Sequence, residues 1–224
     1  MFMSPCSRLR KESAVTLLEV LVLVVVMVLI AGILLPPTGT RSKGKANRIT
    51  CVNNLKNIGL AWRISSTDQG NEFPWHKSGT NGTMELLADP GSVWRHYRFI
   101  SNELGSPRIL VCPSDQERRM ATNFSAFGPG NLSYFLGLEG SEDTLESILG
   151  GDRNMTTNGM DVGPGLLRLG TNMNAGFSVK IHNSAGNVLL GDGSVQQVTS
   201  GRFQETVVNA AMASTNAINR LLVP

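Results

Sequence analysis

The longest apolar run of the chain lies near its start, within residues 12–37. From Val20 to Leu35 it contains 16 residues and no charge. Counted from Val15 it has 21 residues, or about 31 Å of helix, which matches the thickness of a bilayer's hydrocarbon core. The pattern therefore predicts a membrane-spanning helix over residues 15–35. Glu19 stands inside this helix, where a charge costs about 2.5–3.5 kcal/mol and usually marks a function.

A second helical pattern follows the apolar run. Pro36 and Pro37 end the run and predict either a kink or a simple helix stop, because proline removes a backbone hydrogen bond. Beyond them, apolar residues recur at helical spacing between Val52 and Trp62, so one face of an amphipathic helix is expected to lie on a globular head. We therefore expect a kinked helical extension over residues 36–66 and a head over residues 67–224.

The head has weaker patterns. An apolar stretch from Asn187 reaches Asp192-Gly193, and an alternating stretch continues to Val198, which predicts a β-hairpin with a two-residue turn of positive φ angles. The 24 glycines of the whole chain indicate many turns. Short helices are expected at residues 84–88 and 144–149, and a longer one from Phe203 to Arg220.

Two simpler interpretations of the N-terminal run compete with a specialised one. A secretory signal peptide normally has an apolar core of 7–15 residues and a small-x-small cleavage site, and this run is longer and is followed by two prolines. A plain signal anchor accounts for everything except Glu19. The flanks are both basic, so charge leaves the orientation open; the basic residues are Arg8, Arg10, Lys11, Arg41, Lys43, Lys45 and Arg48.

Charge and motif content exclude several classes of function. The formal charge of +3 is small and dispersed, with no basic stripe carrying interleaved aromatic residues, so a nucleic-acid partner is not expected. The sequence has no nucleophile elbow, no zinc-protease motif and no phosphate-binding loop, so the chain is not expected to be an enzyme. One rival remains, an envelope enzyme that uses Asp152 and Asp161 in the loop between residues 150 and 165.

The stretch Ser13-Ala14-Val15-Thr16-Leu17-Leu18-Glu19 resembles the processing site of type IV prepilins and type II secretion pseudopilins. The family has a short basic leader, a small residue, a hydrophobic first mature residue, then Thr-Leu-hydrophobic-Glu and about twenty apolar residues. The resemblance implies a leader over residues 1–14, cleavage between Ala14 and Val15, and N-methylation of Val15. The family prefers Gly where this chain has Ala14, and Phe or Met where it has Val15.

Further stretches resemble a subgroup of these prepilin-like proteins. They are Cys51-Val52-Asn53-Asn54-Leu55-Lys56-Asn57-Ile58-Gly59-Leu60-Ala61, Ile109-Leu110-Val111-Cys112-Pro113-Ser114-Asp115, Gly151-Asp152-Arg153-Asn154 and the closing Asn219-Arg220-Leu221-Leu222-Val223-Pro224. The most specific is His182, nine residues, then Asp192-Gly193, which is similar to the H-x(9)-D-G element of the subgroup's processing-associated domain.

The resemblance implies an α+β, pilin-like fold, in which a long N-terminal helix packs on a small antiparallel sheet with loop-rich insertions. It implies a structural subunit that a prepilin peptidase cleaves and that assembles with its own copies or related pseudopilins into a type II secretion pseudopilus or a type IV pilus-like fibre. The precursor would cross the inner membrane once, with its head in the periplasm or on the cell surface. Thr16, Leu17, Leu18 and Glu19 would serve assembly, Glu19 by pairing with the free amine of a neighbouring subunit. The alternative is an anchored protein that displays its head to a ligand or partner without forming a fibre.

Two of the three cysteines, Cys51 and Cys112, would then lie outside the membrane, where a disulfide can persist. A bridge between them would close a loop of about 60 residues, which the chain-entropy model values at about 4 kcal/mol. Two free thiols are the alternative.

No cofactor is expected. Asp192 and Gly193 are interpreted as turn residues and His182 as a residue that fixes a strand by bonding to backbone, against the alternative that His182 and Asp192 bind a metal or catalyse a reaction. Calcium is a weaker possibility, because Asp152, Asn154, Asn158 and Asp161 lie close together in the sequence. They lack the full EF-hand pattern, so a polar loop is the competing interpretation.

Overall fold

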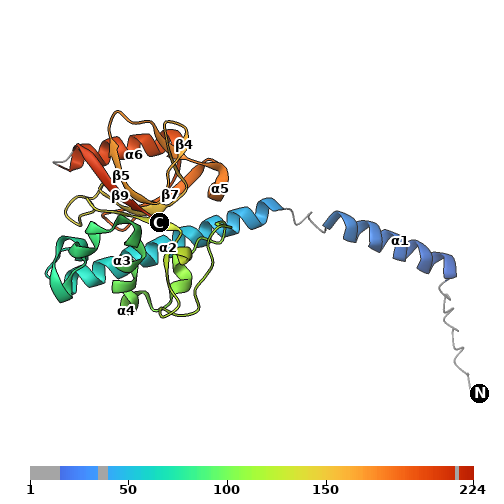
Figure 1. The fold of residues 1–224 in the computed structure, drawn as a ribbon. Coiled ribbons are helices and arrows are strands. Elements are labelled where there is room, and N and C mark those ends of the chain that lie inside the picture. Colours follow the sequence, from blue (N-terminus) through green and yellow to red (C-terminus); the bar gives the residue numbers. More distant parts are fainter. Residues whose placement is uncertain (1–15, 35–39, 215–216) are drawn as a thin grey trace, which may run out of the picture. The chain divides into compact units, whose positions relative to one another are not determined.

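The computed structural model describes residues 16–34, 40–214 and 217–224. The chain divides into two compact units, Met1–Ser42 and Lys43–Pro224. The first unit contains helix α1 (Leu17–Leu34). Helix α2 (Thr40–Asp68) begins in the first unit and lies mostly in the second, which contains every other helix and strand described below (Figure 1).

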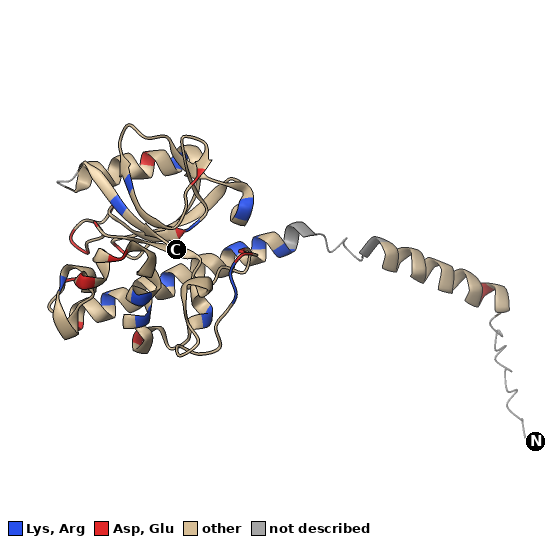
Figure 2. Ribbon diagram, in the orientation of Figure 1, with Lys and Arg blue, Asp and Glu red and all other residues tan. Residues whose placement is uncertain are grey.

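Helix α1 is apolar on all sides and has Glu19 in its first turn (Figure 2). The hydroxyl of Thr16 accepts a hydrogen bond of 3.3 Å from the backbone N–H of Glu19, so Thr16 caps the helix. The helix has 18 residues, or about 27 Å at the usual rise. Across residues 16–34, 40–214 and 217–224, the structure contains no helix with the length and hydropathy needed to span a membrane. Val15, Leu35 and the prolines 36 and 37 lie outside the described residues.

Helix α2 has one buried face. The buried residues recur at helical spacing, as an amphipathic helix requires; they are Cys51, Asn54, Leu55, Ile58, Ala61, Trp62, Ser65 and Ser66. Gly59 lies where α2 comes closest to the sheet, because a Cβ atom there would stand 2.8 Å from a methyl carbon of Leu189. The amphipathic part of the predicted extension to residue 66 therefore packs on the head.

Along the chain, a series of short helices follows α2 and precedes the first strand. Six are 3₁₀-helices, Pro74–His76 (η1), Gly79–Asn81 (η2), Met84–Ala88 (η3), Pro90–Ser92 (η4), Pro107–Leu110 (η5) and Pro129–Asn131 (η6). Two are α-helices, α3 (Val93–Phe99) and α4 (Ser101–Leu104). The helix expected at residues 84–88 is thus present as the 3₁₀-helix η3.

The main sheet of the described chain has six strands in the order β5-β9-β1-β2-β7-β8, and every neighbouring pair is antiparallel. Its strands are β1 (Tyr134–Gly137), β2 (Ile148–Asp152), β5 (Gly165–Gly170), β7 (Ala185–Leu190), β8 (Val195–Thr199) and β9 (Ile218–Val223). A smaller sheet, β4-β3-β6, consists of β3 (Met155–Thr157), β4 (Met160–Asp161) and β6 (Ala175–Phe177). The fold is α+β with an antiparallel sheet, as predicted.

Both faces of the main sheet are covered. Successive residues of a strand point to opposite faces, and in β7 Leu189 belongs to the core beneath α2 whereas Val188 and Leu190 belong to a second core. The second core is closed by helix α6 (Ser200–Ala213), which contributes Phe203, Val207 and Ala210. Figure 1 shows α2 and α6 on opposite sides of the sheet.

Two of the predicted elements need correction. The helix expected from Phe203 to Arg220 ends at Ala213, and Ile218–Val223 forms strand β9 between β5 and β1. The helix expected at residues 144–149 is wrong, because residues 148–152 form strand β2. A helix from Phe203 was predicted, but its position on the far face of the sheet, as a second helix layer, was not.

The hairpin of β7 and β8 is confirmed, but its turn is not the expected one. Leu189 pairs with Val195, and the N–H of Leu190 donates to the carbonyl of Ser194, so three residues, 191–193, form the turn. Only Gly193 of the predicted pair has a positive φ, 82°. This matches a three-residue turn that ends in a left-handed glycine.

Candidate functional site

The residues that the resemblance assigns to assembly lie at the start of α1. Leu17 and Leu18 are largely exposed, and Glu19 stands in the first turn next to its cap, Thr16. Ala14 and Val15, the predicted processing site, lie outside the described residues.

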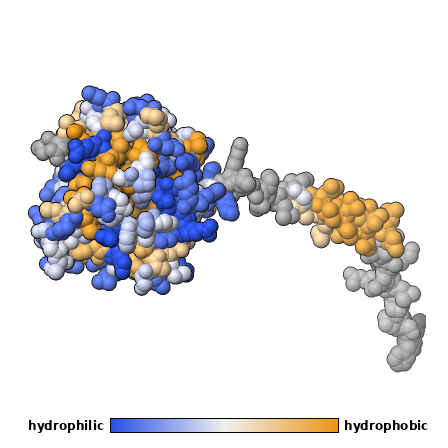
Figure 3. Space-filling view, viewed as in Figure 1, coloured by the Kyte–Doolittle hydropathy of each residue, from blue (hydrophilic) through white to orange (hydrophobic). Residues whose placement is uncertain are grey.

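The surface of α1 is unusual for a helix outside a folded core. Its large apolar side chains from Leu17 to Ile30 are all exposed, from 45% at Val26 to 86% at Leu17. Figure 3 shows this helix as a continuous hydrophobic surface, whereas the visible face of the second unit is mixed. A continuous apolar surface of this kind marks contact with a membrane or with other protein chains.

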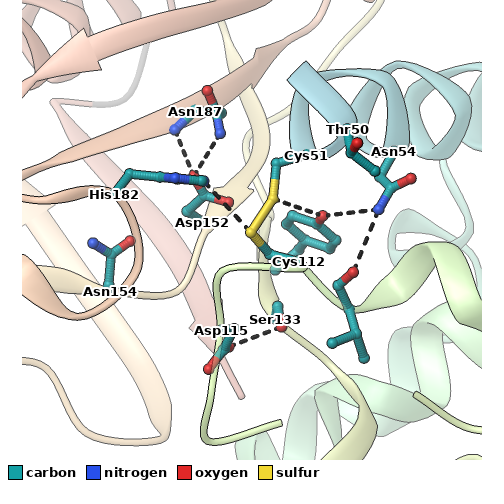
Figure 4. Close-up of a disulfide and its surroundings, with 12 residues drawn as sticks. Thr50, Cys51, Asn54, Cys112, Asp115, Ser133, Asp152, Asn154, His182 and Asn187 are labelled. Carbon is teal, nitrogen blue, oxygen red and sulfur yellow. Dashed lines mark hydrogen bonds and ion pairs between the residues drawn. A yellow bond between two sulfur atoms is a disulfide. The ribbon is translucent and has the colours of Figure 1, made fainter. Parts of the chain in front are cut away.

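A second candidate site lies in the head, where Cys51, Cys112, Asp152 and His182 meet. We call these four residues the junction cluster. Cys51 is on α2, Cys112 follows η5, Asp152 ends β2, and His182 ends the short helix α5 (Val179–His182). Their sulfur, oxygen and nitrogen atoms all lie within 4.8 Å of one another, and all four residues are buried or nearly so (Figure 4).

The two cysteines of the junction cluster form a disulfide with a Cα–Cα distance of 5.3 Å. These are the two cysteines that the sequence analysis proposed as partners. The bridge fixes α2 to the segment that follows η5, 61 residues away in the sequence. Both cysteines are completely buried.

His182 contacts the disulfide and an acid, and the predicted bond to backbone is not what the structure shows. Its Nε2 lies 3.4 Å from Sγ of Cys112 and 3.5 Å from Oδ2 of Asp152. Asp152 Oδ2 also accepts hydrogen bonds from the backbone N–H and the side-chain amide of Asn187, at 2.7 Å and 2.8 Å. His182 therefore lies against Asp152 and the disulfide, although these residues are far apart in the sequence.

Burial shifts the pKa of both Asp152 and His182. Burial raises the pKa of Asp152 to about 7, although the two hydrogen bonds from Asn187 act in the opposite direction. Burial lowers the pKa of His182 to about 4, and the positive charge of Arg48 acts in the same direction. His182 is therefore neutral at pH 7, so its contact with Asp152 is a hydrogen-bonding contact and not an ion pair.

Polar side chains around the disulfide complete the contact between α2 and the sheet. The amide of Asn54 on α2 donates to the carbonyl of Val111 at 3.4 Å and to the hydroxyl of Tyr134 at 3.5 Å. The Tyr134 hydroxyl in turn donates to Sγ of Cys51 at 3.6 Å. These bonds satisfy polar groups that burial would otherwise leave unpaired.

A buried ion pair lies beside the junction cluster. Arg153 donates to both carboxylate oxygens of Asp115, at 2.7 Å and 2.9 Å, and to Glu117 at 2.7 Å. Ser133 donates to Asp115 at 2.8 Å. Hydrogen bonds from Arg153 and Ser133, with the charge of Arg153, lower the pKa of Asp115 although its burial acts to raise it. The carboxylate of Asp115 is therefore held ionised and fixes residues 112–115 against the end of β2.

The calcium candidates do not form a common site. Asp152 is buried and bound by Asn187, and Asn154 donates from its side chain to the carbonyls of Ser178 and Ala185. Asp161 is half exposed and pairs with Lys180 at 3.1 Å. The three side chains thus have separate partners in the structure.

The turn residues have structural contacts. The carboxylate of Asp192 accepts a hydrogen bond of 2.8 Å from the backbone N–H of Ser194, as a turn aspartate does. Its backbone carbonyl accepts a bond of 3.2 Å from Arg63 on α2. The hairpin end is therefore a further attachment point for α2.

The structure brings together stretches that the sequence analysis could only list. Residues from the Cys51, Cys112–Asp115, Asp152–Asn154 and His182 stretches all contribute to the junction cluster or contact a residue that does. No role was predicted from the sequence for Arg153, Asp115, Asn187, Tyr134 or Asn54. The one available signal was a polar residue directly after an apolar strand, as Asp152 follows Ile148–Gly151.

Comparison of the chain with protein-family models, with curated proteins and with solved structures gives no match.

Proposed function

We propose that the chain is a prepilin-like structural subunit of a fibre of the type II secretion or type IV pilus kind. In this proposal a prepilin peptidase removes residues 1–14, and the new N-terminus at Val15 is methylated. The apolar run over residues 15–35 holds the precursor in the inner membrane, with the head in the periplasm or on the cell surface. The mature chain then assembles through α1 with its own copies or with related pseudopilins.

The single observation that carries the proposal is the exposed apolar surface of α1. Thirteen large apolar side chains between Leu17 and Ile30 have no cover within the described chain. Each such side chain gains roughly 1.5–3 kcal/mol when it leaves water. A helix of this kind is stable only inside a bilayer or among other apolar helices, and a fibre core provides the second environment.

Glu19 supports the fibre over the lipid environment. A carboxylate near the end of an apolar helix is costly in hydrocarbon and is stabilised by a positive charge within about 4–6 Å. Cleavage before Val15 would create an amine close to the same end of each helix. Glu19 of one copy would then pair with the amine of its neighbour and set the stagger between them.

The head has features that suit a subunit under mechanical load. The disulfide, the Asn54 contacts and the Arg63 contact all join α2 to the head at separate points. Force applied through the N-terminal helix of a fibre subunit would be resisted by a covalent bond as well as by packing.

N-terminal analysis of the full-length protein, expressed in cells that contain a prepilin peptidase, tests the proposal. We expect mass spectrometry to show a mature chain that begins with methylated Val15. A matched variant, Ala14→Phe, should remain uncleaved because a large side chain replaces the small residue before the cleavage point. An intact Met1 in the wild-type chain would contradict the processing step and leave the anchored display protein as the better interpretation.

A further inference from the structure

The junction cluster has the donor atoms of a zinc site. It combines two cysteine sulfurs, one imidazole nitrogen and one carboxylate oxygen, all buried and all within 4.8 Å of one another (Figure 4). Zinc binds these donor types in tetrahedral sites. We propose that the reduced chain binds one zinc ion through Cys51, Cys112, Asp152 and His182, and that zinc binding and formation of the disulfide exclude each other.

The distances within the cluster fit this proposal. Ligand atoms around a tetrahedral zinc lie roughly 3.3–3.8 Å from one another, given bonds of about 2.0–2.3 Å. Nε2 of His182 already lies 3.4 Å from Sγ of Cys112 and 3.5 Å from Oδ2 of Asp152. The two sulfurs are bonded to each other in the disulfide and are the pair that must separate. Reduction of the disulfide permits that movement.

The carboxylate of Asp152 has one buried oxygen, Oδ1, without a hydrogen-bond partner among the described residues. Asn187 donates two hydrogen bonds to Oδ2, whereas Oδ1 is buried and accepts no hydrogen bond within the described chain. A buried carboxylate oxygen without a donor is costly, and a metal ion would satisfy it. Asn187 would then be a positioning residue, of the kind that orients the ligands of metal sites.

Charge around the cluster also suits the ion. A zinc ion with two thiolates and one carboxylate has a net charge of about −1. Arg48 lies close enough for its positive charge to lower the pKa of both Asp152 and His182, and its Nε is buried without a hydrogen-bond partner among the described residues. A bound site of charge −1 would be a further counter-charge for this guanidinium.

Zinc binding and the later formation of the disulfide require only Zn²⁺ and a small-molecule disulfide as reactants. Cysteines enter the chain as thiols, so Zn²⁺ binds by displacing two protons, one from each sulfur. A small-molecule disulfide then oxidises the site by thiol–disulfide exchange. In that step the two cysteine sulfurs join, the small disulfide takes up two protons and becomes two thiols, and Zn²⁺ is released.

Metal analysis of the full-length chain in detergent tests the proposal. The chain is reduced with a phosphine, desalted without oxygen, incubated with Zn²⁺ or Co²⁺ and desalted again. We expect about one zinc per reduced chain and none in the oxidised chain. Cobalt should give the visible absorption of a tetrahedral thiolate site, which zinc should remove. Adding a small-molecule disulfide should release the zinc to a chromophoric chelator.

Variants separate this site from unspecific binding to thiols. Cys51→Ser, Asp152→Asn and His182→Gln should each lose the cobalt spectrum or weaken zinc binding, and Asn187→Ala should weaken it about 10–100-fold. The matched control is His96→Gln, because His96 is also a buried histidine but contacts Thr83 and not the cluster. It should bind zinc as the wild type does.

Three results would overturn the proposal. A reduced, folded chain that binds no zinc would do so. Unchanged binding in Cys51→Ser or His182→Gln would place the metal elsewhere. If the reduced chain is unfolded without metal, zinc should restore its circular dichroism, and failure to do so would also contradict the proposal. All three results are independent of whether the chain forms a fibre.

Discussion

Helices α1 and α2 are the two long helices of the described chain, and their apolar residues have opposite surroundings. On α1 even the least exposed large side chain before Ala31, Val26, is 45% exposed. On α2 Leu55 and Trp62 are completely buried. The apolar side chains on one face of α2 are packed in the head, and those of α1 are exposed.

This contrast separates stability from assembly. The face of α2 is covered by the head, so changes there should alter the free energy of unfolding of the head. In the proposed fibre the surface of α1 is covered by other chains, so changes there should alter assembly and leave the head as stable as before. Each prediction below tests one side of this contrast.

The largest effect is expected at Trp62. Its indole is completely buried and makes edge contacts with Trp75 at 5.0 Å and Tyr97 at 5.5 Å. Trp62→Ala should lower the free energy of unfolding of the head by about 3–5 kcal/mol, because it leaves a cavity in the core. Denaturant titration in detergent measures this change. The matched control is Leu60→Ala on the exposed side of the same helix, which should stay within about 0.5 kcal/mol. Equal losses in the two variants would contradict the assignment of a buried face to α2.

Removing the disulfide should have the next largest effect. The variant with both Cys51→Ala and Cys112→Ala should lose about 2–4 kcal/mol of unfolding free energy, since the bridge restricts a long loop of the unfolded chain. The comparison with wild type is made under oxidising conditions. Under reducing conditions with a chelator present, the difference should shrink. A difference that persists after reduction would mean that packing of the sulfurs, and not the bridge, is responsible.

Acid should destabilise the head through His96. Burial lowers the pKa of His96 to about 4, below its usual value of 6.5, so the folded state binds the proton more weakly than the unfolded state. The contribution of His96 to the free energy of unfolding is therefore present above pH 6.5 and is lost as the pH falls toward 4. Between pH 7 and pH 5 the expected loss from this group is about 2 kcal/mol, at about 1.36 kcal/mol per pKa unit.

His96→Gln isolates this contribution. His182 acts in the same direction as His96, and Asp152, whose pKa is raised to about 7, acts in the opposite direction. The variant should have a flatter dependence of unfolding free energy on pH than the wild type, measured by denaturant titration at several pH values. Parallel curves for the two proteins would show that His96 has the same pKa in the folded and unfolded states, which would contradict the prediction.

The smallest effect on stability is expected on α1. Leu21→Ser replaces a 60% exposed apolar side chain and should change the unfolding free energy of the head by less than about 0.5 kcal/mol. The same variant should assemble less well, because it places a hydroxyl in the apolar surface. A loss of unfolding free energy comparable with that of Trp62→Ala would contradict the prediction that α1 does not contribute to the stability of the head.

The sequence predicted those parts of the fold that depend on local patterns. The amphipathic face of α2 and the hairpin of β7 and β8 follow from spacing and turn residues. Strand β9 was missed because Ile218 continues the helical spacing of α6, and only its place between β5 and β1 makes it a strand. Likewise, β2 starts at Ile148, and its central position in the sheet could not be read from a short run of apolar residues and glycines.

The junction cluster could not be predicted from the spacing of its residues in the sequence. Cys112 and His182 are 70 residues apart, and the bulged pairing of β2 with β7 brings Asp152 to Asn187. The sequence analysis paired the cysteines from their compartment and the resemblance, but it expected His182 to contact backbone. Long-range strand pairing, which no local pattern encodes, decides that contact.

Photo-cross-linking from α1 tests the central claim, that copies of the chain cover this helix, most directly. A photoreactive amino acid replaces Val24 in the full-length chain, and cells are irradiated. We predict covalent dimers and higher oligomers, which Glu19→Gln should abolish, because glutamine keeps the backbone N–H that bonds to Thr16 but carries no charge. Glu205→Gln, at an exposed acid of the head, should leave them unchanged. Adducts to lipid alone, or the same oligomers in Glu19→Gln, would contradict the account.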